Sequence, residues 1–205
     1  MPASNATALF ASRAPFVLAS ASPRRKSLLE EMGIDFTIKI ADIDEDPDQD
    51  EAPDAFVRRL AEEKALAVSR QDPAAWILAA DTVVVLDRAI LNKPANRDEA
   101  LAMLLHLSGR RHHVLTGFCL LQLASKKRIV RSVQTEVEFM PLSREICEAY
   151  IDTGEPMDKA GAYGIQGQGG CLVRRIDGSY SNVVGLPLVE VIQELLGQGV
   201  IAPAR

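Results

Sequence analysis

Short apolar runs alternate along the chain with segments that carry helical signals. Residues 16–20 form an apolar run of strand length that ends in small side chains. Ser22 then suits the N-cap of a helix, Pro23 its first position and Gly33 its end. Residues 34–41 alternate apolar and polar side chains, which is typical of a half-exposed strand.

The same alternation continues toward the C-terminus. The pattern predicts, in order, a helix from Pro53, a strongly apolar strand at 76–87, a helix at 97–107, strands at 113–122 and 129–140, a helix at about 143–153 and a last helix from near Pro187. Residues 171–176 and 180–184 are predicted to form a hairpin around Asp177-Gly178-Ser179. Strands that alternate with helices indicate an α/β protein.

The composition is that of an ordinary globular protein, with 205 residues of which 47% are hydrophobic and 25% charged. No stretch approaches the roughly 18 consecutive apolar residues of a membrane span, so no transmembrane helix is predicted. The N-terminus has no basic segment followed by an apolar one, so we predict no signal peptide and expect a cytoplasmic protein. Residues 1–14 are predicted to be a disordered leader, and residues 15–205 a single domain.

The net charge of −5 argues against nucleic-acid binding, which needs a basic face, but not against a small anionic ligand. The three cysteines, Cys119, Cys147 and Cys171, are an odd number at spacings that fit neither a disulfide framework nor a metal site. We therefore predict buried, reduced thiols.

The segment S-A-S-P-R-R-K (residues 20–26) places three cations in the first turn of a helix. The positive end of the helix dipole makes cations unfavourable there unless an anion binds. Free N–H groups, the hydroxyls of Ser20 and Ser22 and the guanidinium groups of Arg24 and Arg25 together suit a phosphate chain. A solvated basic turn is the alternative.

Asp81 lies in the middle of the apolar segment I-L-A-A-D-T-V-V-V-L. A carboxylate there is costly unless it is paired, bound to a metal or exposed to a cleft. Asp81 is therefore a candidate general base or metal ligand, and Thr82 points to the opposite face of the strand. An acid at a strand end, held by backbone amides, is the alternative.

Two lysines are ambiguous from the sequence alone. Lys64 follows Leu60 and Phe56 at helical spacing, so its ammonium lies beside the apolar face and reaches either an anion or the solvent. Lys93 precedes a proline in an extended turn after a strand.

The segment D-K-A-G-A-Y-G-I-Q-G-Q-G-G (residues 158–170) concentrates glycine in one loop. Glycine lets the backbone approach a ligand closely. Asp158, Lys159 and Tyr163 add side chains to the loop, and the Gln166 amide offers both a donor and an acceptor to a nucleobase edge. A flexible loop is the alternative, although the interleaved Tyr163 fits it poorly.

The acidic stretch at 42–51 lacks the Gly and Glu that a calcium-binding EF-hand requires. Most of its acids are expected to be solvated, while one or two can meet a divalent ion at the edge of a cleft. The two basic patches for phosphate, the strand carboxylate and the glycine-rich loop with its glutamine together suggest binding of a nucleoside triphosphate and its metal-assisted hydrolysis.

These segments resemble those of the Maf family of nucleotide pyrophosphatases, in the same order. The matching segments are L-A-S-A-S-P-R-R-K-S-L-L (18–29), A-E-E-K-A (61–65), A-A-D-T-V-V-V-L-D (79–87), N-K-P (92–94), L-S-G-R-R-H-H-V-L-T (107–116), D-K-A-G-A-Y-G-I-Q-G (158–167) and V-V-G-L-P-L (183–188). The resemblance thus covers nearly the whole chain from about residue 16. Asn92 departs from it, since many members have Gly there, but Lys93 is retained.

The resemblance implies a mixed α/β fold similar to the inosine triphosphate pyrophosphatases, with an elongated sheet flanked by helices and two lobes around a cleft. It implies hydrolysis of a nucleoside triphosphate to the monophosphate and pyrophosphate with a divalent cation, Mg²⁺ or Mn²⁺. It also implies a homodimer.

The resemblance further implies roles for single residues. Asp81 matches the general base, and Glu45 matches an acid near the metal. Positions linked to substrate choice are matched by Arg24, Thr82 and Gln166. Positions on the phosphate side are matched by Arg25, Lys64, Lys93 and Lys159.

The glycine-rich segment and the Asp81-Thr82 pair resemble the branch of the family that prefers dTTP and UTP. The branch that prefers 7-methyl-GTP usually carries Gln after the aspartate. Hydrolysis of 7-methyl-GTP or of modified pyrimidine nucleotides is the alternative activity. A non-catalytic, nucleotide-sensing regulator of septum formation is the alternative from another class, since the family is also associated with that process.

Overall fold

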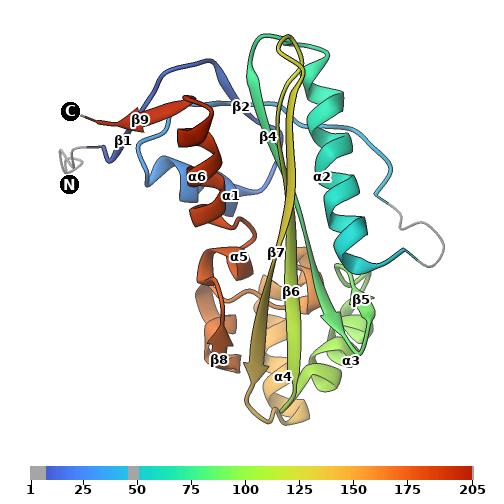
Figure 1. Cartoon of the computed structure of the whole chain (residues 1–205). Helices are drawn as coiled ribbons and strands as arrows, with labels where there is room; N and C mark the ends of the chain where they lie inside the picture. Colours follow the sequence, from blue (N-terminus) through green and yellow to red (C-terminus); the bar gives the residue numbers. More distant parts are fainter. Residues whose placement is uncertain (1–7, 46–50, 205) are drawn as a thin grey trace.

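The computed structural model describes residues 8–45 and 51–204. Within this part of the chain, one seven-stranded mixed sheet follows the order β3-β2-β4-β6-β7-β8, and β5 pairs with β4 at its side (Figure 1). Strands β2, β3 and β4 run parallel, whereas β4, β6, β7 and β8 pair antiparallel in succession. The sheet is therefore mixed, as the resemblance implied.

The strands of the sheet are β2 (Phe16–Leu18), β3 (Thr37–Ile38), β4 (Trp76–Leu86), β5 (Ala89–Leu91), β6 (Arg111–Gln122), β7 (Lys127–Phe139) and β8 (Val173–Asp177). The helices are α1 (Pro23–Glu30), α2 (Pro53–Ser69), α3 (Arg97–Leu107), α4 (Arg144–Asp152), α5 (Tyr180–Val184) and α6 (Leu188–Gly197). Short 3₁₀ turns at Glu155–Asp158, Ala160–Ala162 and Gly167–Leu172 shape the glycine-rich loop.

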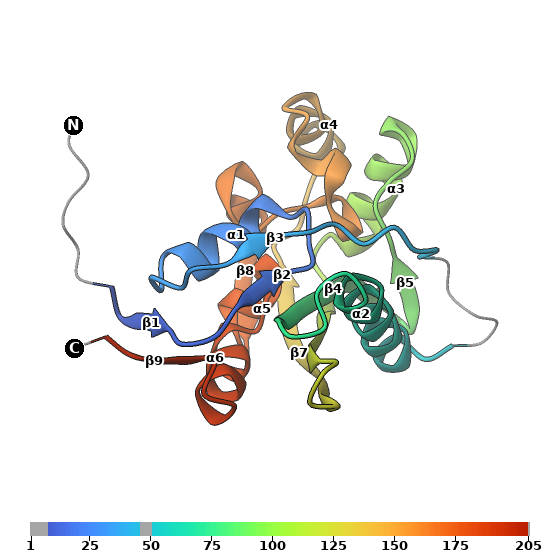
Figure 2. The same cartoon turned by 90° about the horizontal axis from the view of Figure 1, so that it is seen from above.

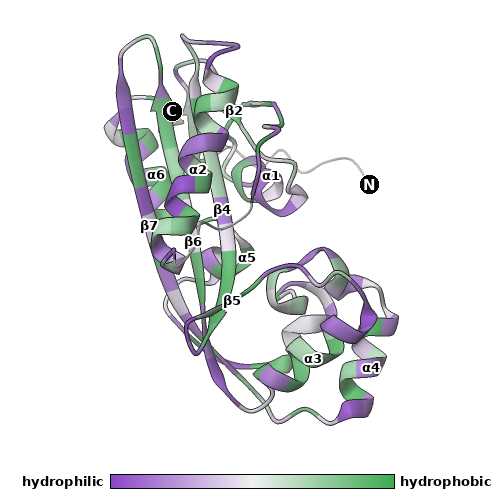
Figure 3. Cartoon of the chain, turned by 90° about the vertical axis from the view of Figure 1, so that its right-hand side faces the viewer, coloured by the Kyte–Doolittle hydropathy of each residue, from purple (hydrophilic) through white to green (hydrophobic). Residues whose placement is uncertain are grey.

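The helices cover the sheet unequally. Helix α2 packs on one face, while α1, α5 and α6 lie on the other face at one end of the sheet (Figures 1 and 2). Helices α3 and α4 pack together at the opposite end and form a second lobe, set apart from α1 (Figure 3).

Strand β4 carries the core of both lobes because its side chains alternate between the two faces. On the face of α2, Ile77 and Ala79 belong to one apolar cluster and Val83 and Val85 to another. Asp81 falls between the two clusters.

On the other face of β4, Leu78 and Ala80 pack in the lobe of α1 and α6, and Val84 and Leu86 pack in the lobe of α3 and α4. Thr82 falls between these two clusters. The polar pair of the strand therefore lies where the apolar packing is interrupted on each face.

The start of α1 follows the sequence prediction. The Ser22 side chain accepts a hydrogen bond from the Arg25 backbone N–H at 3.4 Å, and Pro23 opens the helix. The predicted strand at 34–41 is shorter in the structure, where only Thr37–Ile38 pair with β2.

The predicted hairpin at 171–184 is wrong in its second half, because Tyr180–Val184 form helix α5. Ser179 caps this helix by accepting from the Asn182 N–H at 3.2 Å. The buried Asn182 side chain donates to Val114 O and Thr135 Oγ1, both at 3.0 Å. These tertiary bonds favour a helical turn over the β-propensity of the local sequence.

Two further sequence predictions need correction. Of the predicted leader at 1–14, residues 1–7 lie outside the described part, but β1 (Phe10–Ser12) pairs antiparallel with β9 (Ile201–Pro203). Phe10 packs against the core, so this part of the stretch belongs to the fold. Cys171 is exposed, unlike the other two cysteines, and lies in the short 3₁₀ turn Gly167–Leu172. No helix in the described residues has the length and apolar character needed to cross a membrane.

Helix α2 approaches strand β6 closely at Gly117. A Cβ added there would overlap the Val57 carbonyl and lie 2.8 Å from the backbone nitrogen of Arg58. This contact fixes the distance of α2 from the sheet. It also fixes the height of Lys64, about two helical turns farther along.

We expect Gly117→Ala to destabilise the protein by about 1–3 kcal/mol, since the added methyl group must push α2 away from the sheet. Urea unfolding monitored by circular dichroism measures this change. Gly197→Ala is the matched control, because a Cβ at that position meets no atom within 4 Å. Equal unfolding midpoints for the two variants would contradict the close packing of α2 on β6.

Candidate active site

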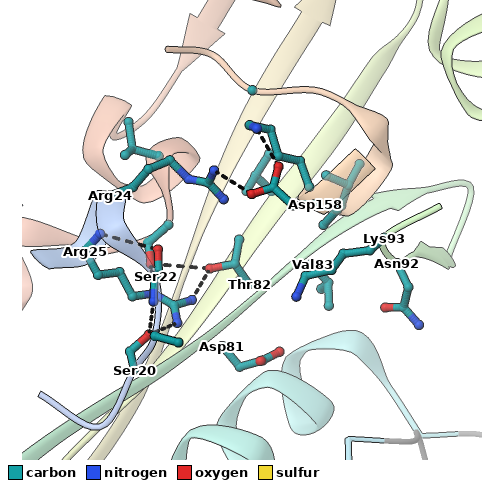
Figure 4. Close-up of a pocket in the computed structure, with 18 of the residues that line it drawn as sticks. Ser20, Ser22, Arg24, Arg25, Asp81, Thr82, Val83, Asn92, Lys93 and Asp158 are labelled. Atoms are coloured by element: carbon teal, nitrogen blue, oxygen red, sulfur yellow. Dashed lines mark hydrogen bonds and ion pairs between the residues drawn. The ribbon is translucent and has the colours of Figure 1, made fainter. Parts of the chain in front are cut away.

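A cleft of about 560 Å³ opens between the two lobes. Its walls come from the loop before α1, the middle of β4, helix α2, the turn after β5 and the glycine-rich loop (Figure 4). Such a volume is typical of sites that hold a small molecule.

An ion-paired group of acids and one lysine forms the wall on the side of α2. Lys64 and Asp81 are both 9% exposed, and the Lys64 ammonium lies 2.7 Å from Asp81 Oδ1. The same ammonium lies 2.8 Å from Glu45 Oε1, and the Glu45 side chain is more exposed. Two carboxylates thus share one ammonium, and this group has an excess of negative charge beside the cleft.

This group fits a divalent cation that is held jointly by protein and substrate. Mg²⁺ and Mn²⁺ prefer oxygen ligands, and Mg²⁺ is usually bound through one or two carboxylates together with phosphate oxygens. Asp81 and Glu45 supply carboxylates of this kind. In the described residues, no cluster of three or more His, Cys, Asp or Glu side chains is arranged to hold a metal by itself.

Arg25 joins the start of α1 to the sheet. Its guanidinium donates to Gly185 O at 2.7 Å, Ala80 O at 2.8 Å, Ser20 Oγ at 3.0 Å and Thr82 Oγ1 at 3.0 Å. Burial lowers the pKa of Arg25, although the nearby Asp81 opposes this shift. Four of the five N–H donors of an arginine are thereby engaged, so Arg25 mainly holds the cleft in shape.

The serines before α1 support this arrangement. Ser20 Oγ accepts from the Ser22 N–H at 3.3 Å as well as from Arg25, and Ser22 caps the helix. Both serines line the cleft at the N-terminus of α1, the end of a helix where phosphate binding is favoured.

Thr82 lies in a polar network on the face of β4 away from Asp81. Its hydroxyl is 2.9 Å from Thr116 Oγ1, and Thr116 donates to Asn182 O at 3.2 Å. The alternation expected from the sequence therefore places Asp81 and Thr82 on opposite faces of the strand. Sequence reasoning missed Thr116 and Asn182, although a threonine inside an apolar strand was a usable signal.

A charged contact crosses the cleft from the first lobe to the glycine-rich loop. Arg24 Nη1 lies 3.8 Å from Asp158 Oδ2 (Figure 4). Lys159 Nζ donates to Asp158 Oδ1 at 2.6 Å and to Glu155 O at 2.5 Å. Asp158 therefore holds two cations near each other at the mouth of the cleft.

Lys93 is exposed at the edge of the cleft, and its side chain points toward Val83 (Figure 4). It has no hydrogen bond or ion pair within the described residues. The neighbouring Asn92 accepts from the Gly161 N–H at 3.1 Å through its backbone carbonyl. The turn that carries Lys93 is thereby attached to the glycine-rich loop.

Gln166 and Tyr163 line the cleft from the glycine-rich loop. The Tyr163 hydroxyl is 2.8 Å from His112 Nε2, and its ring packs edge-on against His112 and Phe139. Burial lowers the pKa of His112 to about 3, so the imidazole is neutral at pH 7. Tyr163 is therefore fixed in the core, whereas Gln166 is exposed.

The cleft brings together every site residue predicted from the sequence. These are Ser20, Ser22, Arg24, Arg25, Glu45, Lys64, Asp81, Thr82, Lys93, Lys159 and Gln166. Their individual roles remain predictions. Asp158, whose pairing with Arg24 no local pattern indicates, joins them as a further charged residue of the cleft.

Comparison with known proteins agrees with this architecture. A family model described as "Maf-like protein" matches residues 15–198. The dTTP/UTP pyrophosphatase of Myxococcus xanthus is 51% identical over 189 residues, which cover 92% of this chain and 95% of that protein. The dTTP/UTP pyrophosphatase of Desulfotalea psychrophila is 49% identical over 188 residues, covering 92% and 96% respectively.

Among solved structures, a HAM1 protein from Coxiella burnetii matches with a TM-score of 0.51 and 17% identity, over 91% of this chain and 100% of that one. This likeness concerns the fold alone. The family match spans both lobes and the cleft between them. The chain therefore belongs to the family of Maf-like proteins.

Proposed function

We propose that this protein is a nucleoside triphosphate pyrophosphatase that hydrolyses dTTP and UTP to the nucleoside monophosphate and pyrophosphate. Relatives that bear this name match more than nine-tenths of the chain. In the structure, the proposal depends most on one observation. The buried Asp81–Lys64 pair opens into the same cleft as the cations Arg24 and Lys93.

The cations bind the triphosphate in this proposal. Lys93 is exposed and has no partner in the part of the chain that the structure describes, so its ammonium is available to phosphate oxygens. Among the residues that the structure describes, Arg24 is held only by a long contact with Asp158, which a phosphate chain displaces readily. Arginine binds phosphate through two parallel N–H groups, which orients the chain as well as neutralising it.

Asp81 acts as the general base that takes a proton from the attacking water. Its carboxylate faces the cleft, and Lys64 holds Oδ1 at 2.7 Å so that the carboxylate has a fixed position. Lys64 also places positive charge near the phosphorus that is attacked, where negative charge develops. Asp81 and Glu45 are the residues that would hold a divalent cation, which would supply Lewis-acid stabilisation of the phosphate charge.

Gln166 selects the base in this proposal. The side-chain amide of Gln166 makes no hydrogen bond within the described residues. It offers a carbonyl oxygen as acceptor and an NH₂ group as donor. The imide edge of thymine or uracil presents the complementary groups. Thr82 contributes through Arg25 and Thr116, because its hydroxyl is already bonded to both. A homodimer and a cytoplasmic location remain predictions from the sequence.

Asp81→Asn is expected to lower turnover of dTTP and UTP at least about a hundredfold, since an amide cannot take the proton. Pyrophosphate release with Mg²⁺ or Mn²⁺ measures the effect. Asp152→Asn is the matched control, because Asp152 is exposed on α4 and pairs with Arg97 outside the cleft. Near-full turnover of a folded Asp81→Asn variant would show that another group is the base.

The proposed substrate class is tested with a panel of dTTP, UTP, CTP and 7-methyl-GTP. We expect Gln166→Ala to lower kcat/KM for dTTP and UTP about tenfold or more, the size of one or two lost hydrogen bonds. Gln168→Ala is the control on the same loop, because its side chain lies outside the cleft and its backbone N–H is retained. Preference of the wild type for 7-methyl-GTP would contradict the proposal, and binding without turnover would favour the nucleotide-sensing regulator.

A further inference from the structure

The carboxylate of Glu155 supports the glycine-rich loop on the side away from the cleft lining. Glu155 Oε1 accepts from the Tyr150 hydroxyl at 2.8 Å and from the Gly169 N–H at 3.1 Å. Glu155 Oε2 accepts from the Gln168 N–H at 3.0 Å. A single half-buried side chain thus organises three donors from helix α4 and the loop.

The Tyr150 hydroxyl extends this support to the other side of Gln166. It accepts from the Gly164 N–H at 3.1 Å while it donates to Glu155. The backbone is therefore fixed at Gly164, before Gln166, and at Gln168 and Gly169, after it. The Gln166 amide has no partner of its own in the described residues, so its position depends on these backbone bonds.

The glycines of the loop fit this support closely. A Cβ at Gly167 would lie 2.8 Å from Glu155 Oε2, and a Cβ at Gly169 would overlap the Tyr150 hydroxyl. Gly167 also has a φ of +76°, which side chains rarely adopt. The glycines at these two positions are thus explained by the approach of the loop to Glu155 and Tyr150, rather than by a ligand.

The charge of Glu155 matters because an ionised carboxylate only accepts hydrogen bonds. Burial acts to raise the pKa of Glu155, but the N–H groups of Gln168 and Gly169 and the hydroxyl of Tyr150 outweigh it and lower the pKa. A glutamine in its place would direct an NH₂ group toward an N–H or O–H donor, so at least one of these hydrogen bonds would be lost.

We propose that Glu155, together with Tyr150, is a positioning residue for base recognition: it fixes the backbone on both sides of Gln166 so that the amide meets the pyrimidine edge. Glu155 is not among the residues that line the cleft, so in this proposal it acts through the backbone of the loop. The proposal rests on the proposed function, in which Gln166 selects thymine or uracil. It adds that Glu155 and Tyr150 act on this selection through the position of Gln166.

The decisive experiment is a double-mutant cycle with Glu155→Gln and Gln166→Ala, with UTP and dTTP as substrates. We expect Glu155→Gln to raise KM about tenfold and to change kcat by less than about twofold, because the Asp81–Lys64 pair is untouched. In the Gln166→Ala background, the same substitution is expected to raise KM no further. The hydrogen bond from Lys159 to the backbone carbonyl of Glu155 is retained in this variant.

Two further variants complete the test. Glu148→Gln is the matched control, because Glu148 pairs with Arg144 on the surface of α4, and it is expected to leave KM unchanged. Tyr150→Phe removes one donor to Glu155 and the acceptor for Gly164, and it is expected to raise KM by a smaller factor. This variant decides the question if Glu155→Gln does not fold, as judged by its thermal melting.

A fall in kcat with KM unchanged, or equal effects of Glu155→Gln with and without Gln166, would overturn the positioning role. Unchanged KM in both folded variants, Glu155→Gln and Tyr150→Phe, would overturn it as well. Absence of turnover in the wild type is a different result, because it contradicts the proposed function itself.

Discussion

The ion pair between Lys64 and Asp81 is the interaction on which the site depends. A lone carboxylate in the middle of a buried strand is expensive, and so is a lone ammonium on the buried face of a helix. Each offsets part of the desolvation cost of the other, and the two charges meet only when α2 lies at the correct distance from β4. Gly117 permits that distance, so a glycine in a neighbouring strand supports the chemistry indirectly.

Much of the site could be predicted from the sequence because its residues violate local rules. Asp81 interrupts an apolar strand, Lys64 lies on an apolar helical face, and three cations follow the N-cap at Ser22. Such residues cost stability where they stand, so a partner or a ligand is implied. The structure places Asp81, Lys64, Arg24 and Arg25 at one cleft, whereas Lys26 lies outside it and pairs with Glu30 on α1.

Other residues could not be predicted because they violate no local rule. Glu155 follows a helix, as many exposed acids do, and only the folded loop shows its three donors. Helix α5 was predicted as a strand because the buried partners of Asn182 come from β6 and β7, far away in the sequence. Arg25 looked like a phosphate ligand, whereas most of its donors are used within the protein.

Because Asp81 and Thr82 lie on opposite faces of β4, the site is sensitive to insertions and deletions in this strand. Asp81 needs α2 on one side, and Thr82 needs Arg25 and Thr116 on the other. A single residue inserted earlier in the strand would exchange the two faces, and the carboxylate would then face Arg25 while the hydroxyl faced Lys64. A substitution in β4 thus changes one side chain, whereas the insertion or deletion of one residue exchanges the faces on which the carboxylate and the hydroxyl lie.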